Sequence, residues 1–332
     1  MGKINNVWNH YFRNRERFAD LFNGTFFQGK RHIKAENLTD TSEIYEESEA
    51  EKINTSERVE RLERIRDIKM KLNDSELLYF LAVENQNQVD YAMPFRCMQY
   101  DTMEYGRQLN EIRTKNTAEN AYESWAERTC GIRKTDRIMP IYTLCVYHGE
   151  EPWDGPRSLK DMMSFSNADD SMKEFFSDYP LRLLFLNEKE DFSAFHTEIR
   201  QLFQAMKYRK NKKKLQELLT TDPQYQHMDV DTLEVLSVVL NVPELWENRK
   251  LYLNKEAEKE EVNMCQALEE WLADERMAGM EVGKQQGILS TLSSLVTQGL
   301  LKLEDAARQA GMSEEDFTKI AELSLEKPLK QG

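Results

Sequence analysis

Length and charge narrow the classes of protein to which the chain can belong. The chain has 332 residues, more than a single hydrophobic core usually supports, so more than one domain is expected. Its 45 basic and 59 acidic residues give a net charge of −14, which excludes a uniformly basic nucleic-acid coat but leaves room for local basic patches. A hydrophobic fraction of 40% is enough to build a core, so disorder as the main state is also excluded.

Cysteine spacing and hydropathy indicate the compartment. The four cysteines show no C-x-x-C spacing, so neither a zinc site nor a disulfide framework is predicted, and a reducing cytoplasm is expected. The longest apolar stretches, 77–83 and 138–147, are far shorter than the roughly 20 residues that span a bilayer. The sequence therefore predicts a cytoplasmic protein with no membrane partner.

The local net charge changes from positive to negative within the first sixty residues. Residues 1–34 contain seven basic and two acidic residues, whereas residues 35–60 contain nine acidic and two basic residues. Apolar residues at helical spacing predict a first helix over 18–22, closed by Gly24. The acidic segment 35–60 has few large apolar residues and is predicted to be a solvated connector.

A β-hairpin is predicted next. Two extended segments, 64–71 and 77–86, are separated by a segment with the Asn, Asp and Ser that turns favour. If the turn is centred between Ser75 and Glu76, antiparallel pairing places Asp67 opposite Glu84. Alternation along the second strand places Glu84 and Gln86 on the same face.

Strands and helices alternate through the remainder of the first half. Pro94 begins a helix whose apolar stripe continues to Leu109, residues 111–136 are polar and aperiodic, and 138–147 reads as a strand buried on both faces. A further strand is predicted over 181–186, and from residue 192 onward the pattern is almost entirely helical, including a long charged segment over 250–284. The predicted organisation is an α/β domain over 1–190, a helical region with a long charged helix over 191–285, and a small helical tail over 286–332.

The facing acids of the hairpin predict a metal site. Opposed positions on antiparallel strands bring β-carbons to about 5 Å, so the two carboxylates can share a hard divalent cation. Glu84 follows the apolar run LLYFLAV, where an unpaired carboxylate is costly unless it has a partner or a function. The alternative is that both acids are solvated charges at a sheet edge.

Several motifs resemble a known family. They are Arg66-Asp67, Glu84-Asn85-Gln86, Met93-Pro94-Phe95-Arg96 with Tyr100, and the segment YHGEEPW over 147–153. FADLFNG near the start, YRKNKKKLQELL over 208–219 and NMCQALEEW over 263–271 extend the similarity over most of the chain. In their order and number these motifs resemble the Rpn family of recombination-promoting nucleases, often described as transposases of the PD-(D/E)XK nuclease superfamily.

The resemblance implies a fold and an activity. The implied fold is a restriction-endonuclease-like core, with a central mixed sheet, flanking helices and the catalytic acids on a hairpin. Asp67 and Glu84 are then Mg²⁺ ligands, with Mn²⁺ as a substitute, and the main-chain carbonyl of Asn85 is a third ligand. Gln86 stands where the superfamily has a lysine, and a glutamine orients a water through neutral hydrogen bonds only.

The resulting hypothesis is a DNA endonuclease. Mg²⁺ held by Asp67 and Glu84 lowers the pKa of a bound water, Gln86 orients that water, and the hydroxide attacks a phosphodiester in line. The chain would promote DNA recombination or belong to a mobile element. Two alternatives stay open: a catalytically weak DNA-binding or regulatory protein that keeps the fold, and a helical oligomerisation scaffold.

Three further residues are candidates for a supporting role. Lys69 shares a strand face with Asp67 and can replace the missing lysine charge, although a surface lysine is the simpler account. Arg96 begins the helix after the hairpin and can contact phosphate, although arginine is common on helix surfaces. Asp20, on the first helix, is an additional candidate acid.

A basic segment is the predicted DNA contact. Residues 207–214 (KYRKNKKK) contain six basic residues and no acid, and can follow a phosphate backbone. The predicted DNA-binding side chains are Lys207, Arg209, Lys210, Lys212, Lys213 and Lys214. A solvated helix or loop end is the alternative.

The C-terminal part is predicted to mediate self-association. Gly279, Gly283 and Gly287 recur every four residues, which on a helix makes a smooth face for close approach of another backbone, although a weakened helix explains them equally well. The tail reads as two short helices around Gly311. A homo-oligomer formed through the C-terminal helical region is therefore expected.

Overall fold

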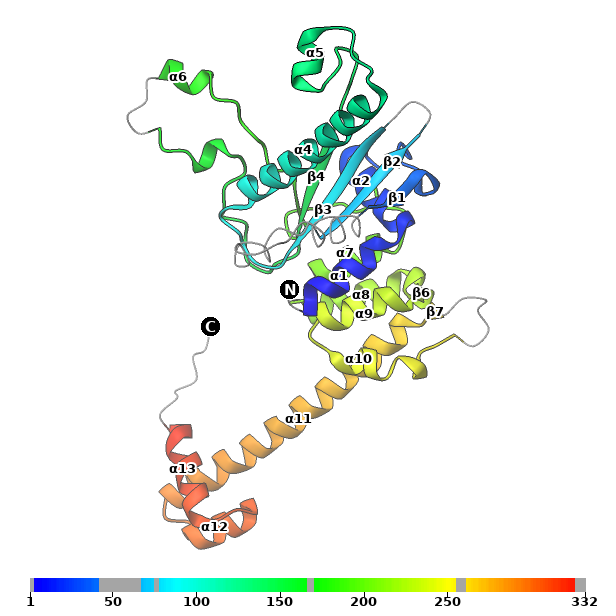
Figure 1. The fold of residues 1–332 in the computed structure, drawn as a ribbon. Helices are drawn as coiled ribbons and strands as arrows, with labels where there is room; N and C mark the ends of the chain where they lie inside the picture. Colours follow the sequence, from blue (N-terminus) through cyan, green and yellow to red (C-terminus); the bar gives the residue numbers. More distant parts are fainter. Residues whose placement is uncertain (1–2, 42–66, 75–77, 166–169, 255–260, 326–332) are drawn as a thin grey trace. The chain divides into compact units, whose positions relative to one another are not determined.

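The computed structural model describes residues 3–41, 67–74, 78–165, 170–254 and 261–325 (Figure 1). The chain divides into two compact units, residues 1–265 and 266–332. The first unit contains a sheet with helices, and the second contains helices in its described residues. The three predicted domains stay a prediction.

A mixed five-stranded sheet is the centre of the first unit. The strands follow chain order across the sheet: β1 antiparallel to β2, β2 antiparallel to β3, and β3, β4 and β5 parallel to one another. β4 is apolar and almost wholly buried, as its sequence predicts. The prediction of an α/β fold with a mixed sheet is confirmed. The strand bounds are β1 Leu38–Asp40, β2 Ile68–Asn73, β3 Leu78–Gln86, β4 Ile141–Tyr147 and β5 Leu183–Phe185.

The hairpin β2–β3 has the predicted register. Ile68 pairs with Val83 and Asn73 pairs with Leu78, so the same register places Asp67, one residue before β2, opposite Glu84. Residues 75–77 of the connection and residues 64–66 of the predicted first strand lie outside the described residues. The prediction that 35–60 is a connector is wrong for Leu38–Asp40, which forms the edge strand β1.

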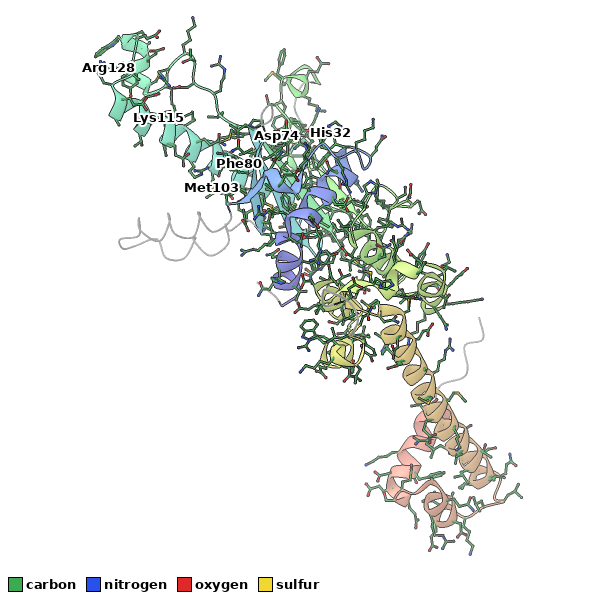
Figure 2. All side chains as sticks on the ribbon, turned by 90° about the vertical axis from the view of Figure 1, so that its right-hand side faces the viewer. His32, Asp74, Phe80, Met103, Lys115 and Arg128 are labelled. Carbon is green, nitrogen blue, oxygen red and sulfur yellow. The ribbon has the colours of Figure 1, made fainter. Side chains whose placement is uncertain are left out.

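One face of the sheet is covered by α4, Met93–Glu119. Lys69 of β2 contacts Glu104 of this helix, and Thr143 of β4 donates a hydrogen bond to Asp101 at 2.7 Å. The helix extends well into the segment that the sequence predicts to be irregular, and α5, Trp125–Cys130, follows it. Figure 2 shows Lys115 and Arg128 at the far end of this pair, away from Phe80 in the sheet, which explains why the second half of α4 is polar.

Helices α1, Lys3–Arg13, and α2, Arg15–Phe26, lie on the opposite side of the sheet from α4. The side chain of Asn14 separates them, because it accepts hydrogen bonds from the N–H groups of Glu16 and Arg17 as an N-cap. The sequence predicts that Gly24 ends the helix. This is wrong, because Gly24 lies within α2. A β-carbon there would lie 2.4 Å from the Phe195 ring, so the glycine permits close packing instead.

The residues after 190 pack against these first helices. Arg17 is buried and forms ion pairs with Asp229 and with Asp231, the latter at 3.0 Å, while its guanidinium lies over the Tyr11 ring. These contacts join the start of the chain to α9. The further elements here are α7 Ile199–Lys207, α8 Lys212–Thr221, α9 Val230–Val239, α10 Pro243–Glu247 and the strand pair β6 Met228–Asp229 with β7 Glu261–Val262. Short elements complete the unit: α6 Asp170–Glu174 and the 3₁₀ turns η1 Ala35–Asn37, η2 Lys160–Met162, η3 Pro223–Gln226 and η4 Arg249–Leu251.

The C-terminal helices are α11 Met264–Thr297, α12 Leu303–Ala310 and α13 Glu314–Leu325. The long helix begins at Met264 rather than at residue 250, because η4 and β7 precede it. It also runs through residue 285, where the sequence places a domain boundary. Gly311, with φ of +72°, joins α12 to α13 as predicted for the tail. The glycines at 279, 283 and 287 lie on α11 and are exposed.

Within the described part of the chain, no helix has both the length and the apolar character that are needed to cross a bilayer.

Candidate active site at the β2–β3 hairpin

Two buried carboxylates face each other on the hairpin. Asp67 is 7% exposed and Glu84 is 1% exposed, although carboxylates are rarely buried this deeply without a partner. Asp67 directly precedes β2, and Glu84 lies near the end of β3, in the register described above. Gln86 is the last residue of β3 and shares the face of Glu84 by alternation. The alternative of solvated charges at a sheet edge is therefore wrong.

Asp67 is held by two hydrogen bonds. Its Oδ2 accepts from the main-chain N–H of Asn85 at 2.7 Å, and its Oδ1 accepts from Nδ2 of Asn9 at 3.1 Å. Burial raises the pKa of Asp67, and these two bonds together with the nearby charge of Arg96 partly oppose that rise. Each carboxylate oxygen keeps a lone pair that can bind a cation.

Arg96 brings a positive charge to the same place. It forms an ion pair with Asp90 and donates a hydrogen bond to the Tyr100 hydroxyl at 3.4 Å. Burial opposes the charge of Arg96, but the bonds to Tyr100 and Asp90 and the negative charge of Glu84 outweigh burial and raise its pKa. Burial also raises the pKa of Tyr100, and the Glu84 charge adds to this. The structure thus brings Arg96 near both acids.

Lys69 lies on the α4 side of the sheet and is 1% exposed, so the alternative of a surface lysine is wrong. Its Nζ donates to Oε2 of Glu104 at 2.8 Å, and Arg107 pairs with the same carboxylate. Burial favours the neutral form of Glu104, but Arg107 and Lys69 prevail and lower its pKa. Lys69 therefore takes part in the sheet–α4 interface through Glu104, and Arg96 brings a further positive charge to the acids.

Asp20 has a structural explanation. Its carboxylate accepts hydrogen bonds from the main-chain N–H groups of His196 and Thr197 and from the Thr197 hydroxyl, between 2.7 and 3.0 Å. These bonds fasten α2 to the turn before α7. The structure does not bring Asp20 into the contacts of Asp67 described above.

His148 follows β4 and is stacked on Trp8 of α1, with ring centroids 4.7 Å apart. Its main-chain N–H donates to the carbonyl of Gln86 at 2.9 Å. Burial and, to a smaller extent, the charge of Arg209 lower the pKa of His148 to about 3. The ring is therefore neutral near pH 7, when an unperturbed histidine is only partly so.

The basic segment 207–214 is divided by its surroundings. Lys207 pairs with Glu190, Lys210 pairs with Glu150, and Arg209 donates to the carbonyl of His148 at 2.9 Å. Lys207 and Arg209 are largely buried around the loop between α7 and α8, whereas the ion pair of Lys210 is exposed. The side chains at the start of α8 are exposed: Lys212, Lys213 and Lys214.

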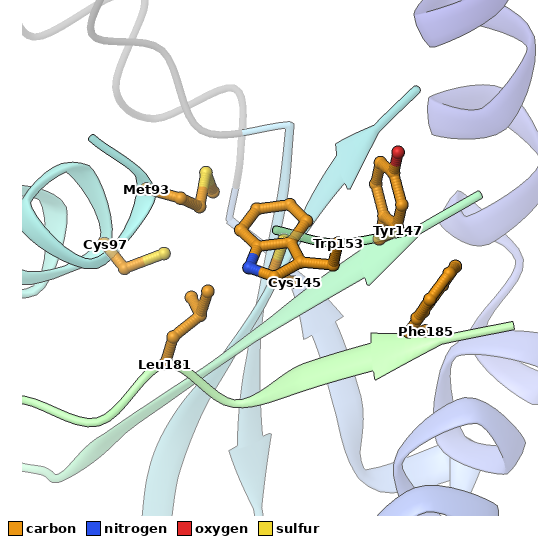
Figure 3. Close-up of a cluster of buried hydrophobic side chains, with 7 residues drawn as sticks. All are labelled: Met93, Cys97, Cys145, Tyr147, Trp153, Leu181 and Phe185. Carbon is orange, nitrogen blue, oxygen red and sulfur yellow. The ribbon is translucent and has the colours of Figure 1, made fainter. Parts of the chain in front are cut away.

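The loop after β4 is anchored by a buried cluster. Figure 3 shows Trp153 beside Tyr147 of β4, with Met93 and Cys97 from the start of α4 on one side and Phe185 of β5 on the other. Trp153 and Tyr147 make an edge-to-face contact with centroids 5.1 Å apart. This cluster fixes the start of α4, which carries Arg96, relative to β4.

The donor set fits a hard cation with two protein carboxylates. Within the described ranges, no three His, Cys, Asp or Glu side chains gather as a metal site. For such a cation, Asp67 and Glu84 would supply two anionic oxygens, and main-chain oxygen and water would complete the shell. Mg²⁺ is commonly bound in this way, through one or two carboxylates with several waters retained.

Comparison with known proteins identifies the family. Residues 53–231 match the family model described as "Putative transposase, YhgA-like". This span includes the hairpin, α4, β4 and the basic segment, and it agrees with the resemblance found in the sequence motifs. Neither a curated protein nor a solved structure matches the chain. Since the match covers more than half of the 332 residues, the chain belongs to the YhgA-like transposase family.

Proposed function

We propose that the chain is a Mg²⁺-dependent DNA endonuclease that acts in recombination or in the movement of a mobile element. The observation that carries the proposal is the opposition of two buried carboxylates, Asp67 and Glu84, on neighbouring strands. Two such groups are costly to bury, and a shared divalent cation offsets this cost. Membership of a transposase family supports DNA as the substrate.

The proposed fold is a restriction-endonuclease-like core. The mixed sheet, with its antiparallel hairpin and helices on both sides, supports the proposal because the resemblance implies a core of this kind. In this arrangement the hairpin presents its acids at the point where β3 ends. The irregular loop after β4 lies beside that point, because His148 bonds to the carbonyl of Gln86.

The residues divide the chemistry among them. When bound, Mg²⁺ supplies the Lewis acidity that activates a water and neutralises charge on the phosphate. Asp67 and Glu84 hold the cation, and the main-chain carbonyl of Asn85 is the third proposed ligand. Gln86 orients the attacking water by hydrogen bonding. Arg96 contributes positive charge toward a phosphate oxygen and takes over the role of the absent lysine.

The first test is cleavage of supercoiled plasmid by the purified full-length chain. We expect nicked or linear DNA to appear with Mg²⁺ or Mn²⁺ and to be abolished by a chelator, because both carboxylates require the cation to bring a water to the phosphate. The measurement is the initial rate of loss of supercoiled DNA on a gel. If the protein slows the migration of DNA on the gel but leaves the DNA uncut with either metal, the endonuclease proposal is overturned. The chain would then be a DNA-binding protein that keeps the nuclease-like fold.

We further propose that the exposed lysines at the start of α8 contact the DNA backbone. Positive charge at a helix N-terminus opposes the helix dipole at a cost of about 0.3–1 kcal/mol per residue, and phosphates bound by the three successive lysines would offset this cost. Replacing Lys213 and Lys214 with glutamine is expected to reduce the slope of log K against log salt by about 0.9 for each phosphate that the variant no longer neutralises. Fluorescence anisotropy with labelled duplex at several salt concentrations measures the slope.

The matched control is Lys115→Gln, an exposed lysine at the far end of α4 (Figure 2). This variant should leave the salt slope unchanged. A slope that falls equally for both sites would mean that binding depends on general charge rather than on α8.

A further inference from the structure

Asn9 of α1 is hydrogen-bonded to two residues of the candidate metal site, Asp67 and Asn85. Its Nδ2 donates to Oδ1 of Asp67 at 3.1 Å, and its Oδ1 accepts from Nδ2 of Asn85 at 2.8 Å. The main-chain N–H of Asn85 in turn donates to Oδ2 of Asp67 at 2.7 Å. Three residues that are far apart in the sequence thus form a closed ring of hydrogen bonds.

This ring fixes the carboxylate of Asp67. One bond reaches each of its oxygens, so the plane of the carboxylate is set from two directions. Asp67 lies one residue before the first ladder pair of β2, and the strand hydrogen bonds therefore hold its backbone less firmly than that of Glu84. A metal-binding side chain needs its geometry held to within about 0.5 Å, and hydrogen bonds from neighbouring residues commonly provide this.

The position of Asn9 is itself fixed by packing. Trp8 is fully buried and stacks on His148, and Tyr11 and Phe12 are also fully buried. Arg17 donates to the carbonyl of Tyr11 at 3.3 Å, which ties α1 to α2. Asn9 is only partly buried, so it lies where the interior meets solvent. α1 therefore presents the Asn9 amide to the hairpin from a rigid base.

We propose that Asn9 is a positioning residue for the metal site, holding Asp67 and Asn85 in the geometry that binds the cation. The inference rests on the proposed function and extends it to α1, which lies outside the family match at 53–231. Asn9 touches neither substrate nor cation in this role and acts through Asp67 and Asn85.

The test is Mn²⁺ binding, measured by calorimetry on full-length wild type, Glu84→Gln, Asn9→Leu, Asn9→Ser and Asn6→Leu. Leucine keeps the approximate volume but makes no hydrogen bond, and loss of such a supporting residue typically weakens metal binding 10- to 100-fold. We expect Asn9→Leu to weaken binding by about tenfold or more, and Asn9→Ser, whose hydroxyl can donate and accept, to restore part of it. Asn6→Leu changes an exposed asparagine on the same helix and should bind as wild type does.

Two further readouts separate positioning from a loss of fold. Asn9→Leu should stay folded, with a thermal unfolding midpoint somewhat below that of wild type because buried Asn85 loses a hydrogen-bond partner. Its DNA affinity should stay near that of wild type, and excess Mn²⁺ should restore its cleavage rate. If wild type binds Mn²⁺ through Glu84 and Asn9→Leu binds it equally well, the inference about Asn9 is overturned while the proposed function stands. If wild type has no Glu84-dependent site, both are overturned.

Discussion

Replacing Glu84 with glutamine is expected to lower the rate of plasmid cleavage by about 10²- to 10³-fold, the scale on which loss of one preorganised electrostatic group reduces kcat. Glutamine has nearly the same shape but no charge. Because Glu84 is only 1% exposed, water cannot enter to take the place of its carboxylate without movement of the surrounding side chains. The cation would then have one anionic ligand in place of two. The measurement is the initial rate of nicking with Mg²⁺ for wild type and variant.

The control for this experiment is Glu119→Gln, an exposed acid at the end of α4. It should cleave at the wild-type rate. That result would show that loss of one negative charge anywhere on the protein is not sufficient to cause the cleavage defect of Glu84→Gln. Asp67→Asn should reproduce the defect of Glu84→Gln, since both acids face the same cation. Cleavage by Glu84→Gln at the full rate would contradict the placement of the active site at the hairpin.

Replacing Lys69 with methionine is expected to lower the free energy of unfolding by about 1–3 kcal/mol, the usual cost of taking one hydrogen-bond partner from a buried charged group. Methionine fills most of the same space, so the loss comes from leaving the Glu104 carboxylate, which is 1% exposed, with Arg107 as its remaining basic partner. Urea unfolding followed by far-UV circular dichroism measures the change. Lys71→Met, on the same strand but only partly buried, should change stability far less.

The pH dependence of this effect has a definite sign. The pKa of Glu104 is lowered from its ordinary 4.5 in the folded protein, so its stabilising contribution is complete above pH 4.5 and is lost as the pH falls through the lowered value. The difference between wild type and Lys69→Met should therefore shrink in acid. The double variant Lys69→Met/Glu104→Leu should recover much of the loss, because it removes both members of the buried pair. A double variant as unstable as the single one would contradict this account.

The hairpin could be predicted from the sequence because its signals are local. Turn-forming residues lie between a segment of alternating charged and apolar residues and an apolar run, and the pairing of Asp67 with Glu84 follows from the position of the turn alone. The buried strand β4 was predictable for the same reason, since a continuous apolar run has few alternatives. These two elements are enough to place both acids.

The supporting contacts were not predictable because they join distant parts of the chain. Asn9 lies 58 residues before Asp67 and 76 residues before Asn85, and no spacing rule relates such positions. α1 itself was missed because its apolar residues are few and lie in a short segment among polar and basic residues. The spacing of Trp8, Tyr11 and Phe12, at i, i+3 and i+4, is the signal of its buried face.

Lys69 illustrates a different difficulty. Its side-chain direction was correct, but the partner that makes burial possible, Glu104, lies on a separate helix. A signal was present in α4, where Tyr100, Asp101, Glu104 and Gln108 are polar or amphipathic residues at helical spacing on the face that meets the sheet. Polar residues on the inner face of a helix indicate buried partners across the interface.

The position of α1 and α2 has a consequence for choosing fragments of this protein. The family match begins at residue 53, but both helices precede it, and they supply much of the apolar cover for the sheet unit through Trp8, Phe12, Phe18 and Phe22. A fragment that starts at the family boundary would begin with this interior uncovered and with Asp229 and Asp231 deprived of Arg17. The segment that matches the family model is therefore shorter than the segment that folds as one unit. A fragment for expression should include α1 and α2.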